Sequence, residues 1–420
     1  MNEKLFAYIA ACPTAFHTCA RSADMLRAAG YTELCEAQRW EIVPGGKYFV
    51  TRNGSSLIAF RVPAGDMAGF MMTAAHGDSP AFKIKENAEL PDGNYLRLSV
   101  EKYGGMLCAP WLDRPLSVAG RVAVSEGDML SVKLVDLKTP CAIIPNVAIH
   151  MNRNANDGMK YMANVDTIPL FSSDDPAAAI LPMAAEAAGV SPEDVLGSDL
   201  FLYCRGQGVT LGAHNEYVLS PRLDDLACVW GCLEGFLAAR DTGALPVLCI
   251  FDNEEVGSET KQGAASAFLR DTLRRITFAL GHDEETFRTM LARSFLLSAD
   301  NAHAIHPNHP EYSDGDNCPR MNGGVVIKFN ANQRYATDGR SCALFRSICK
   351  AADVPTQVMA NRSDLPGGST LGSIANTLVP VSTVDIGLAQ LAMHSAWETM
   401  GTEDCAHLAA AARQTFETVL

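Results

Sequence analysis

The sequence predicts an α/β fold: a central mixed β-sheet flanked by helices, with a β-rich domain inserted into the chain. Strand-length apolar runs alternate with segments of helical periodicity in residues 1–90 and again in residues 213–420. Between them, residues 91–212 contain short alternating apolar segments separated by turns with Gly and Asp. We therefore expect the two outer parts to form one α/β domain and the middle part to form a second domain.

The first 90 residues are expected to contribute two helices within residues 1–30 and then three strands. The strands are predicted over residues 47–52, 56–60 and 69–75. The first two strands flank Asn53–Gly54, which is typical of a two-residue hairpin turn. The third strand is followed at once by His76 and Asp78, so an imidazole and a carboxylate lie where a buried strand ends.

The inserted part is expected to be mostly strand. The clearest alternating segments are residues 95–100, 116–124 and 129–134. One helix is predicted near residues 177–188. No internal repeat or low-complexity tract is apparent in the chain.

Residues 213–420 resume the first pattern. The elements expected here are a helix after Asp224 and Asp225, strands over 247–251, 294–299, 325–329, 356–359 and 379–386, and helices over 264–276, 339–352 and 402–420. The run 247–251 is apolar throughout, which predicts a central strand buried on both faces. Glu254 and Glu255 follow it, and Gly257 then permits a tight turn.

Composition excludes several classes of function. The chain has 420 residues, a net charge of -14 and 48% hydrophobic residues. The acidic balance argues against nucleic acid as the main partner, and no uninterrupted apolar segment is long enough for a membrane span. The 13 cysteines are odd in number and lack framework spacing, so we expect reduced thiols in a cytoplasmic protein.

Metal-binding side chains follow three of the predicted strands. These are His76 with Asp78, Glu254 with Glu255, and Asp300, while Asp224 precedes a helix and His394 precedes the last helix. Two imidazoles with only three of these carboxylates already exceed one tetrahedral site, but they suit two ions that share a bridging carboxylate. From these residues alone two alternatives stay open: a solvated acidic turn at Glu254–Glu255, and histidines that are packed in the core.

Other catalytic signatures are missing from the sequence. There is no GxSxG elbow and no recognised cysteine nucleophile signature, which leaves serine or cysteine hydrolase chemistry without support. No GxGxxG follows a strand and no Walker loop is present, so nucleotide chemistry is also unsupported. HExxH, the signature of one class of single-zinc protease, is absent as well.

The ordered set of motifs resembles the aspartyl aminopeptidase family of two-metal exopeptidases. The matching segments are residues 13–17 (PTAFH), 76–80 (HGDSP), 220–225 (SPRLDD), 251–258 (FDNEEVGS), 298–308 (SADNAHAIHPN), 332–336 (NQRYA) and 391–395 (LAMHS). The resemblance implies a zinc exopeptidase type of fold, in which the β-rich insertion 91–212 is a dimerisation domain and the outer parts 1–90 and 213–420 are catalytic. It also implies two Zn²⁺ per subunit, with Mn²⁺ or Co²⁺ as alternatives.

The resemblance assigns a role to each candidate site residue. It implies that His76, Asp224 and Asp300 hold one ion, and that Asp224, Glu255 and His394 hold the other. The catalytic residues it implies are Glu254, as general base, and Asp78, which hydrogen-bonds His76. The implied substrate-binding residues are Lys328, Tyr335, His303 and His150, the last of which reaches a neighbouring subunit's site.

The expected activity is removal of the N-terminal residue from peptides, with preference for Asp or Glu. Because the whole chain is acidic, an acidic substrate needs a local cation, and Lys328 is the implied candidate. The family assembles from dimers, so a dodecamer is expected. The alternatives are a related two-metal aminopeptidase of neutral or broad specificity, and a non-catalytic, self-assembling scaffold or cargo protein on the same fold.

Overall fold

A computed structural model gives the arrangement of residues 1–65, 67–127, 129–173, 175 and 177–420. The largest sheet has nine strands in the order β1-β2-β3-β13-β4-β14-β18-β16-β17. Its strands are β1 (Thr32–Leu34), β2 (Lys47–Arg52), β3 (Ser56–Arg61), β4 (Phe70–His76), β13 (Leu245–Phe251), β14 (Phe295–Ala299), β16 (Val325–Phe329), β17 (Thr356–Ala360) and β18 (Ser382–Gly387). Parallel and antiparallel pairs both occur, which confirms the predicted mixed sheet.

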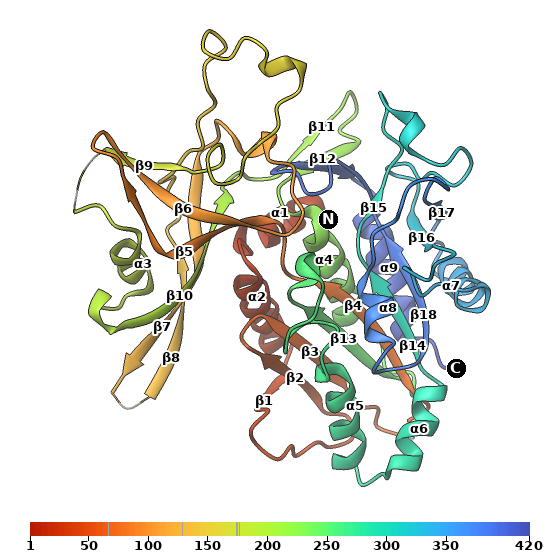
Figure 1. Ribbon diagram of the computed structural model, residues 1–420. Helices are drawn as coiled ribbons and strands as arrows, with labels where there is room; N and C mark the ends of the chain where they lie inside the picture. The colour runs from red at the N-terminus through yellow and green to blue at the C-terminus, as the bar shows by residue number, and fades with distance from the viewer. Residues whose placement is uncertain (66, 128, 174, 176) are drawn as a thin grey trace.

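Helices cover both faces of this sheet (Figure 1). One core cluster joins the sheet to α1, α2, α4, α7 and α9, and a second joins it to α5, α6 and α8. The helices are α1 (Asn2–Ala11), α2 (Ala15–Ala28), α4 (Leu223–Ala238), α5 (Phe268–Ala279), α6 (Glu284–Ala292), α7 (Gly339–Ala351), α8 (Leu371–Ala375) and α9 (Asp404–Phe416). Strand β13 is buried along its whole length between β3 and β4, as its continuous apolar run predicted.

A second sheet lies beside the first one and has the order β8-β7-β10-β5-β6-β9 (Figure 1). Its elements are β5 (Ala81–Pro91), β6 (Tyr95–Tyr103), β7 (Leu116–Glu126), β8 (Met129–Asp136), β9 (Leu170–Ser173) and β10 (Val195–Cys204). Helix α3 (Ile180–Ala188) packs on it through a core cluster of its own. The first strand of this second sheet, β5, begins at Ala81. The domain boundaries expected at residues 90 and 212 stay predictions.

A third sheet of short strands was not predicted. It has the order β11-β12-β20-β19-β15. Its strands are β11 (Val209–Leu211), β12 (Tyr217–Ser220), β15 (Ala302–His303), β19 (Ala389–Leu391) and β20 (Glu398–Gly401). None of these strands exceeds four residues, which is too short for an apolar alternation to be recognised.

The first turn of α2 contains a histidine, His17, that makes stability depend on pH. The Nδ1 atom of His17 lies 2.9 Å from Oγ1 of Thr14, and burial lowers the pKa of His17 to about 4. An unfolded histidine takes up a proton below about pH 6.5, whereas the folded one stays neutral until about pH 4. Folding therefore loses stability as the pH falls from about 6.5 to about 4.

We expect His17→Gln to remove much of this loss. The free energy of unfolding of each protein is measured by denaturant titration at pH 7 and at pH 4.5. Its decrease between these two pH values should be about 2 kcal/mol smaller in the variant than in the parent. His282→Gln, at an exposed histidine, is the control. Identical pH dependence of the parent and His17→Gln would show that His17 is accessible to protons in the folded chain.

Candidate active site

The site lies where three neighbouring strands of the central sheet end. Strands β13, β4 and β14 are adjacent and mutually parallel, so their carboxyl ends share one edge. His76 is the last residue of β4, Asp300 follows β14 directly, and Glu254 and Glu255 lie in the turn after β13. Ligands of open α/β sheets bind at this edge, which is where these polar side chains are gathered.

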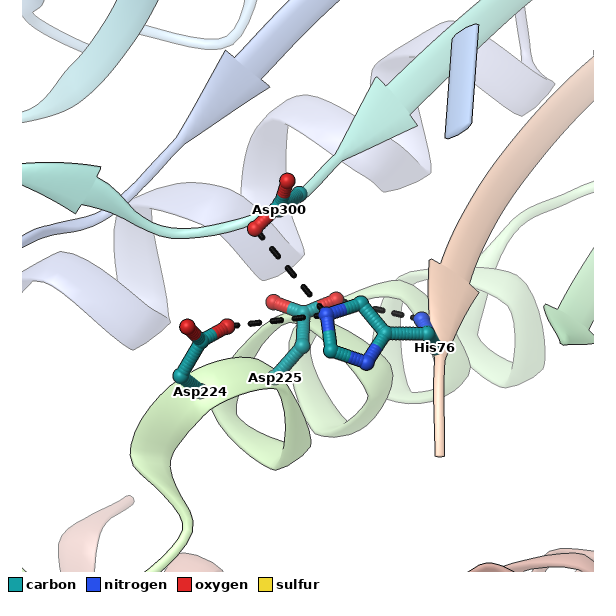
Figure 2. Close-up of side chains that lie close together, drawn as sticks. All are labelled: His76, Asp224, Asp225 and Asp300. Carbon is teal, nitrogen blue, oxygen red and sulfur yellow. Dashed lines mark hydrogen bonds and ion pairs between the residues drawn. The ribbon is translucent and has the colours of Figure 1, made fainter. Parts of the chain in front are cut away.

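Helix α4 brings two aspartates to the same edge (Figure 2). Nε2 of His76 lies 3.6 Å from Oδ1 of Asp224 and 4.0 Å from Oδ1 of Asp300. Asp225, the next residue on α4, accepts a hydrogen bond from the backbone N–H of His76 at 3.2 Å. One ligand atom from each of His76, Asp224, Asp225 and Asp300 fits within a sphere of the size that a metal ion requires.

A second group shares Asp224 with the first. Nε2 of His394 lies 3.2 Å from Oδ2 of Asp224 and 3.3 Å from Oε2 of Glu255. The two carboxylate oxygens of Asp224 therefore face two different imidazoles, those of His76 and His394. This is the arrangement that a carboxylate bridging two cations requires.

The turn after β13 presents the two glutamates to the site. Asn253 adopts a left-handed conformation with φ of 62°, which asparagine tolerates better than most residues. Its side-chain oxygen accepts hydrogen bonds from Thr260 and Gln262, both at 2.8 Å. Glu254 and Glu255 follow in a short 3₁₀ turn, and Oε2 of Glu254 reaches to 3.9 Å from Nε2 of His76.

Asp78 connects the first imidazole to this turn. Its Oδ1 lies 3.3 Å from Nδ1 of His76 and accepts a hydrogen bond from the backbone N–H of Glu254 at 3.2 Å. Its Oδ2 accepts from the N–H of Glu255 at 3.2 Å and from the hydroxyl of Tyr103 at 2.7 Å. A carboxylate on the far nitrogen of an imidazole fixes the ring's tautomer and orientation.

Three residues of the site were not predicted. Glu398 is buried, and it accepts hydrogen bonds from the backbone N–H groups of Asp224 at 3.0 Å and His394 at 2.7 Å. Asp225 was expected only to favour the start of a helix, and Tyr103 was not singled out. The sequence could have indicated Asp225 through its position next to Asp224. It gave no such indication for Glu398 and Tyr103, whose contacts join segments far apart in the sequence.

The buried carboxylates of the site carry negative charge that cations would compensate. Three buried carboxylate oxygens, Oδ1 of Asp224, Oδ1 of Asp225 and Oε1 of Glu255, have no hydrogen-bond partner among the described residues. Burial and neighbouring carboxylates raise the pKa of Glu254 to about 8 and raise that of Glu255 well above its usual value. Buried oxygens of this kind are stabilised when they ligate a metal ion, so the residues fit divalent cations.

The predicted substrate-binding residues are divided between two regions. Lys328 is buried, and its ammonium lies 3.5 Å from Oδ2 of Asp300 and 5.5 Å from the ring centre of Tyr335. His303 is exposed in β15, three residues after Asp300. His150 is exposed in the long segment between β8 and β9, which stands out from the molecule (Figure 1), and it belongs to none of the groups above.

Comparisons with known proteins agree with this geometry. The family model described as Aminopeptidase I zinc metalloprotease (M18) matches residues 8–416. A probable M18 family aminopeptidase 2 of Clostridium novyi is 43% identical over 414 residues, which cover 96% of this chain and 95% of that protein. A protein of the same description from Stutzerimonas stutzeri is 40% identical over 418 residues, covering 97% and 96%.

The chain belongs to the M18 family of aminopeptidases. It is thus a metallo-aminopeptidase of a zinc-dependent family, and the resemblance seen in the motifs is confirmed at family level, since the M18 family includes the aspartyl aminopeptidases. The solved structure of the Ape4 and Nbr1 complex matches with a TM-score of 0.96 and 33% identity, covering 99% of this chain and 85% of that one. The mApe1 dodecamer of S. cerevisiae matches with a TM-score of 0.88 and 26% identity, covering 99% and 96%.

None of the helices in the part of the chain that the structure describes is long and apolar enough to span a membrane.

Proposed function

We propose that this M18 aminopeptidase removes the N-terminal residue of peptides with two zinc ions per subunit, and that it prefers Asp or Glu. The observation that carries the two-ion proposal is the shared position of Asp224, whose two carboxylate oxygens face His76 and His394 separately. His76, Asp224 and Asp300 are the proposed ligands of one ion. Asp224, Glu255 and His394 are the proposed ligands of the other.

The proposed chemistry divides between the metal and Glu254. When bound, zinc supplies a Lewis acid that polarises the scissile carbonyl and lowers the pKa of water. Glu254 is the proposed general base, which takes a proton from the attacking water and delivers it to the leaving amine. A base needs a pKa near the working pH, and burial raises that of Glu254 in this direction. Asp78 is proposed to hold His76 in one tautomer.

Lys328 supports the preference for acidic substrates. It is a buried cation at the same sheet edge, on β16, and lies beside Tyr335. A buried ammonium attracts a substrate carboxylate strongly because little water screens it. One observation favours neutral or broad specificity instead: the ammonium already lies 3.5 Å from Asp300. Once Asp300 ligates a cation, however, part of its negative charge is neutralised and Lys328 can pair with substrate.

Parallel assays of Asp-, Glu- and Leu-anilides decide between these specificities. We expect kcat/KM of the parent to be highest for the two acidic substrates. Lys328→Met should lower kcat/KM for Asp-anilide by about 10–100-fold, because it removes one partner of a buried charge pair. The value for Leu-anilide should fall much less.

Lys83→Met is the matched control for this experiment. Lys83 forms an ion pair with Asp199 at 2.9 Å in the second sheet and should leave the ratio of the two activities unchanged. A parent enzyme that prefers Leu-anilide would contradict the acidic preference and favour the neutral alternative.

We also propose that the chain assembles from dimers into a dodecamer, with residues 91–212 as the dimerisation domain and His150 reaching a neighbouring subunit. The support is likeness to the mApe1 dodecamer over nearly the whole chain. Native mass measurement should give twelve 45.1 kDa chains, and a monomer would contradict the proposal. Cytoplasmic location stays a prediction. A non-catalytic scaffold has no need of Glu254 and five metal ligands, so enzymatic activity would exclude it.

A further inference from the structure

A short segment of the second sheet runs along the candidate metal site. Strand β6 ends at Tyr103, and residues 103–107 lie against residues of the candidate site. The backbone N–H of Leu107 donates a hydrogen bond to the carbonyl of His394 at 3.1 Å. Tyr103 donates to Asp78, and Gly104 lies against Glu255. One strap, defined as residues 103–107, therefore touches three of the proposed site residues.

We propose that Tyr103 is a positioning residue for the metal site, so that the second sheet fixes the geometry of the central one. This inference rests on the ligand assignment under the proposed function and goes beyond it. Its basis is the hydroxyl of Tyr103, which donates to Oδ2 of Asp78 at 2.7 Å and accepts from Nδ2 of Asn253 at 2.9 Å.

The hydroxyl acts on the site through Asp78. That carboxylate is buried and has four neighbours: His76 and Glu254 at Oδ1, and Glu255 and Tyr103 at Oδ2. Tyr103 supplies the shortest of these contacts. Without it, the one hydrogen bond left to Oδ2 among the residues that the structure describes comes from the N–H of Glu255 at 3.2 Å, and the carboxylate is free to rotate toward a better donor. Nδ1 of His76 lies 3.1 Å from the backbone carbonyl oxygen of Asp78 and 3.3 Å from Oδ1, so such a rotation removes one of the two groups that orient the imidazole.

The same hydroxyl also links Asp78 to the turn that carries the glutamates. Asn253 donates to the tyrosine oxygen, which leaves the hydroxyl proton directed at Asp78. Asn253 is the left-handed residue that begins this turn. Loss of the hydroxyl therefore removes two hydrogen bonds at once: the one to Asp78, which orients His76, and the one from Asn253, which holds the turn that carries Glu254 and Glu255.

Gly104 allows the strap to approach this closely. Its φ is +77°, and a Cβ atom built there would lie 3.1 Å from Cβ of Glu255. Alanine at this position is strained by its backbone and also pushes against a proposed ligand. Gly104→Ala is therefore a second, independent way to disturb the contact between the strap and the site.

The test is Tyr103→Phe, which removes one hydroxyl and keeps the ring. Its control is Tyr203→Phe, because Tyr203 belongs to the second sheet, donates to Oδ1 of Asp136 at 2.7 Å and lines the same cavity of about 190 Å³ between the sheets. Zinc affinity is measured by competition with a chromophoric chelator, and kcat and KM are measured at saturating zinc.

We expect Tyr103→Phe to lower zinc affinity by about 10–100-fold, the usual effect of losing a partner of a metal-bound imidazole. We expect kcat to fall while KM stays within about twofold of the parent value, since the inferred role of Tyr103 is exerted through Asp78. We expect Tyr203→Phe to match the parent. Parent-like zinc affinity in Tyr103→Phe overturns the inference, and so does equal loss in both tyrosine variants.

Two further results complete the experiment. If Tyr103→Phe does not accumulate as folded protein, Gly104→Ala decides on the same readouts: a weakened zinc site supports the inference and parent-like affinity overturns it. A parent chain that binds no zinc pair overturns the proposed function, and this inference with it. If the parent binds two zinc ions and Tyr103→Phe binds them with the same affinity, this inference is overturned and the proposed function is not.

Discussion

Glu254→Gln is expected to lower kcat by about 10²–10⁴-fold and to leave KM and zinc content close to those of the parent. Glutamine has nearly the shape of glutamate but cannot accept a proton from water. The loss therefore isolates proton transfer from substrate binding and from metal binding. Steady-state kinetics with Asp-anilide, together with elemental analysis of zinc per subunit, measure all three quantities.

The position of Glu254 explains why its removal should spare the ions. Its Oε2 lies 3.9 Å from Nε2 of His76, so it borders the first group of proposed ligands. The three-residue groups proposed as ligands do not include it, and the backbone N–H of Glu254, which the substitution retains, is the group that bonds Asp78. The scaffold of the site should survive the exchange of one carboxylate oxygen for an amide.

Glu259→Gln is the matched control, because Glu259 is exposed in the same loop five residues further on. It should retain the kcat of the parent. A Glu254→Gln enzyme with parent kcat would remove the general-base assignment, and one that has lost zinc would reassign Glu254 as a ligand.

Strands that are long and apolar were predictable from sequence, and so was the edge at which they end. The runs that became β4, β13 and β14 are buried on both faces, as short, continuously apolar runs are in the centre of a sheet. Because these three strands are parallel neighbours, the residues that follow them had to meet. His76, Glu254, Glu255 and Asp300 were therefore within reach of pattern reasoning, whereas their roles came from the family resemblance.

The partners that hold these side chains could not be predicted in the same way. Glu398 accepts from the backbone amides of Asp224 and His394, and Tyr103 donates to Asp78 from another sheet. Such hydrogen bonds depend on tertiary approach and leave no periodicity in the sequence. The strands of the third sheet were missed for a related reason: four residues or fewer do not establish an alternation.

Asp224→Asn is expected to cost the enzyme both ions and to lower kcat/KM by at least about 10³-fold. Metal ions contribute several kcal/mol to transition-state stabilisation, and about 4 kcal/mol corresponds to that factor. Asparagine keeps one carbonyl oxygen, but its amide group then faces one of the two imidazoles that Asp224 now faces with carboxylate oxygens. A single change should therefore weaken both proposed zinc sites, which no other ligand substitution is expected to do.

Asp404→Asn separates loss of metal from loss of stability. Asp404 is also fully buried, and it accepts hydrogen bonds from the backbone N–H groups of Asn322 at 2.7 Å and Gly324 at 3.2 Å, away from the site. Its substitution should lower the free energy of unfolding by about 1–3 kcal/mol while both zinc ions remain.

Chelation of the parent provides the complementary measurement for Asp224. Dialysis against a strong chelator should reduce activity to the level of Asp224→Asn, and added zinc should restore the parent but not the variant. Because Asp224 is shared, zinc titration of His394→Ala should differ from that of Asp224→Asn by retaining one tight site formed by His76, Asp224 and Asp300. Two ions bound with parent affinity in Asp224→Asn would show that the carboxylate does not bridge, and the two groups of ligands would then have to act as separate sites.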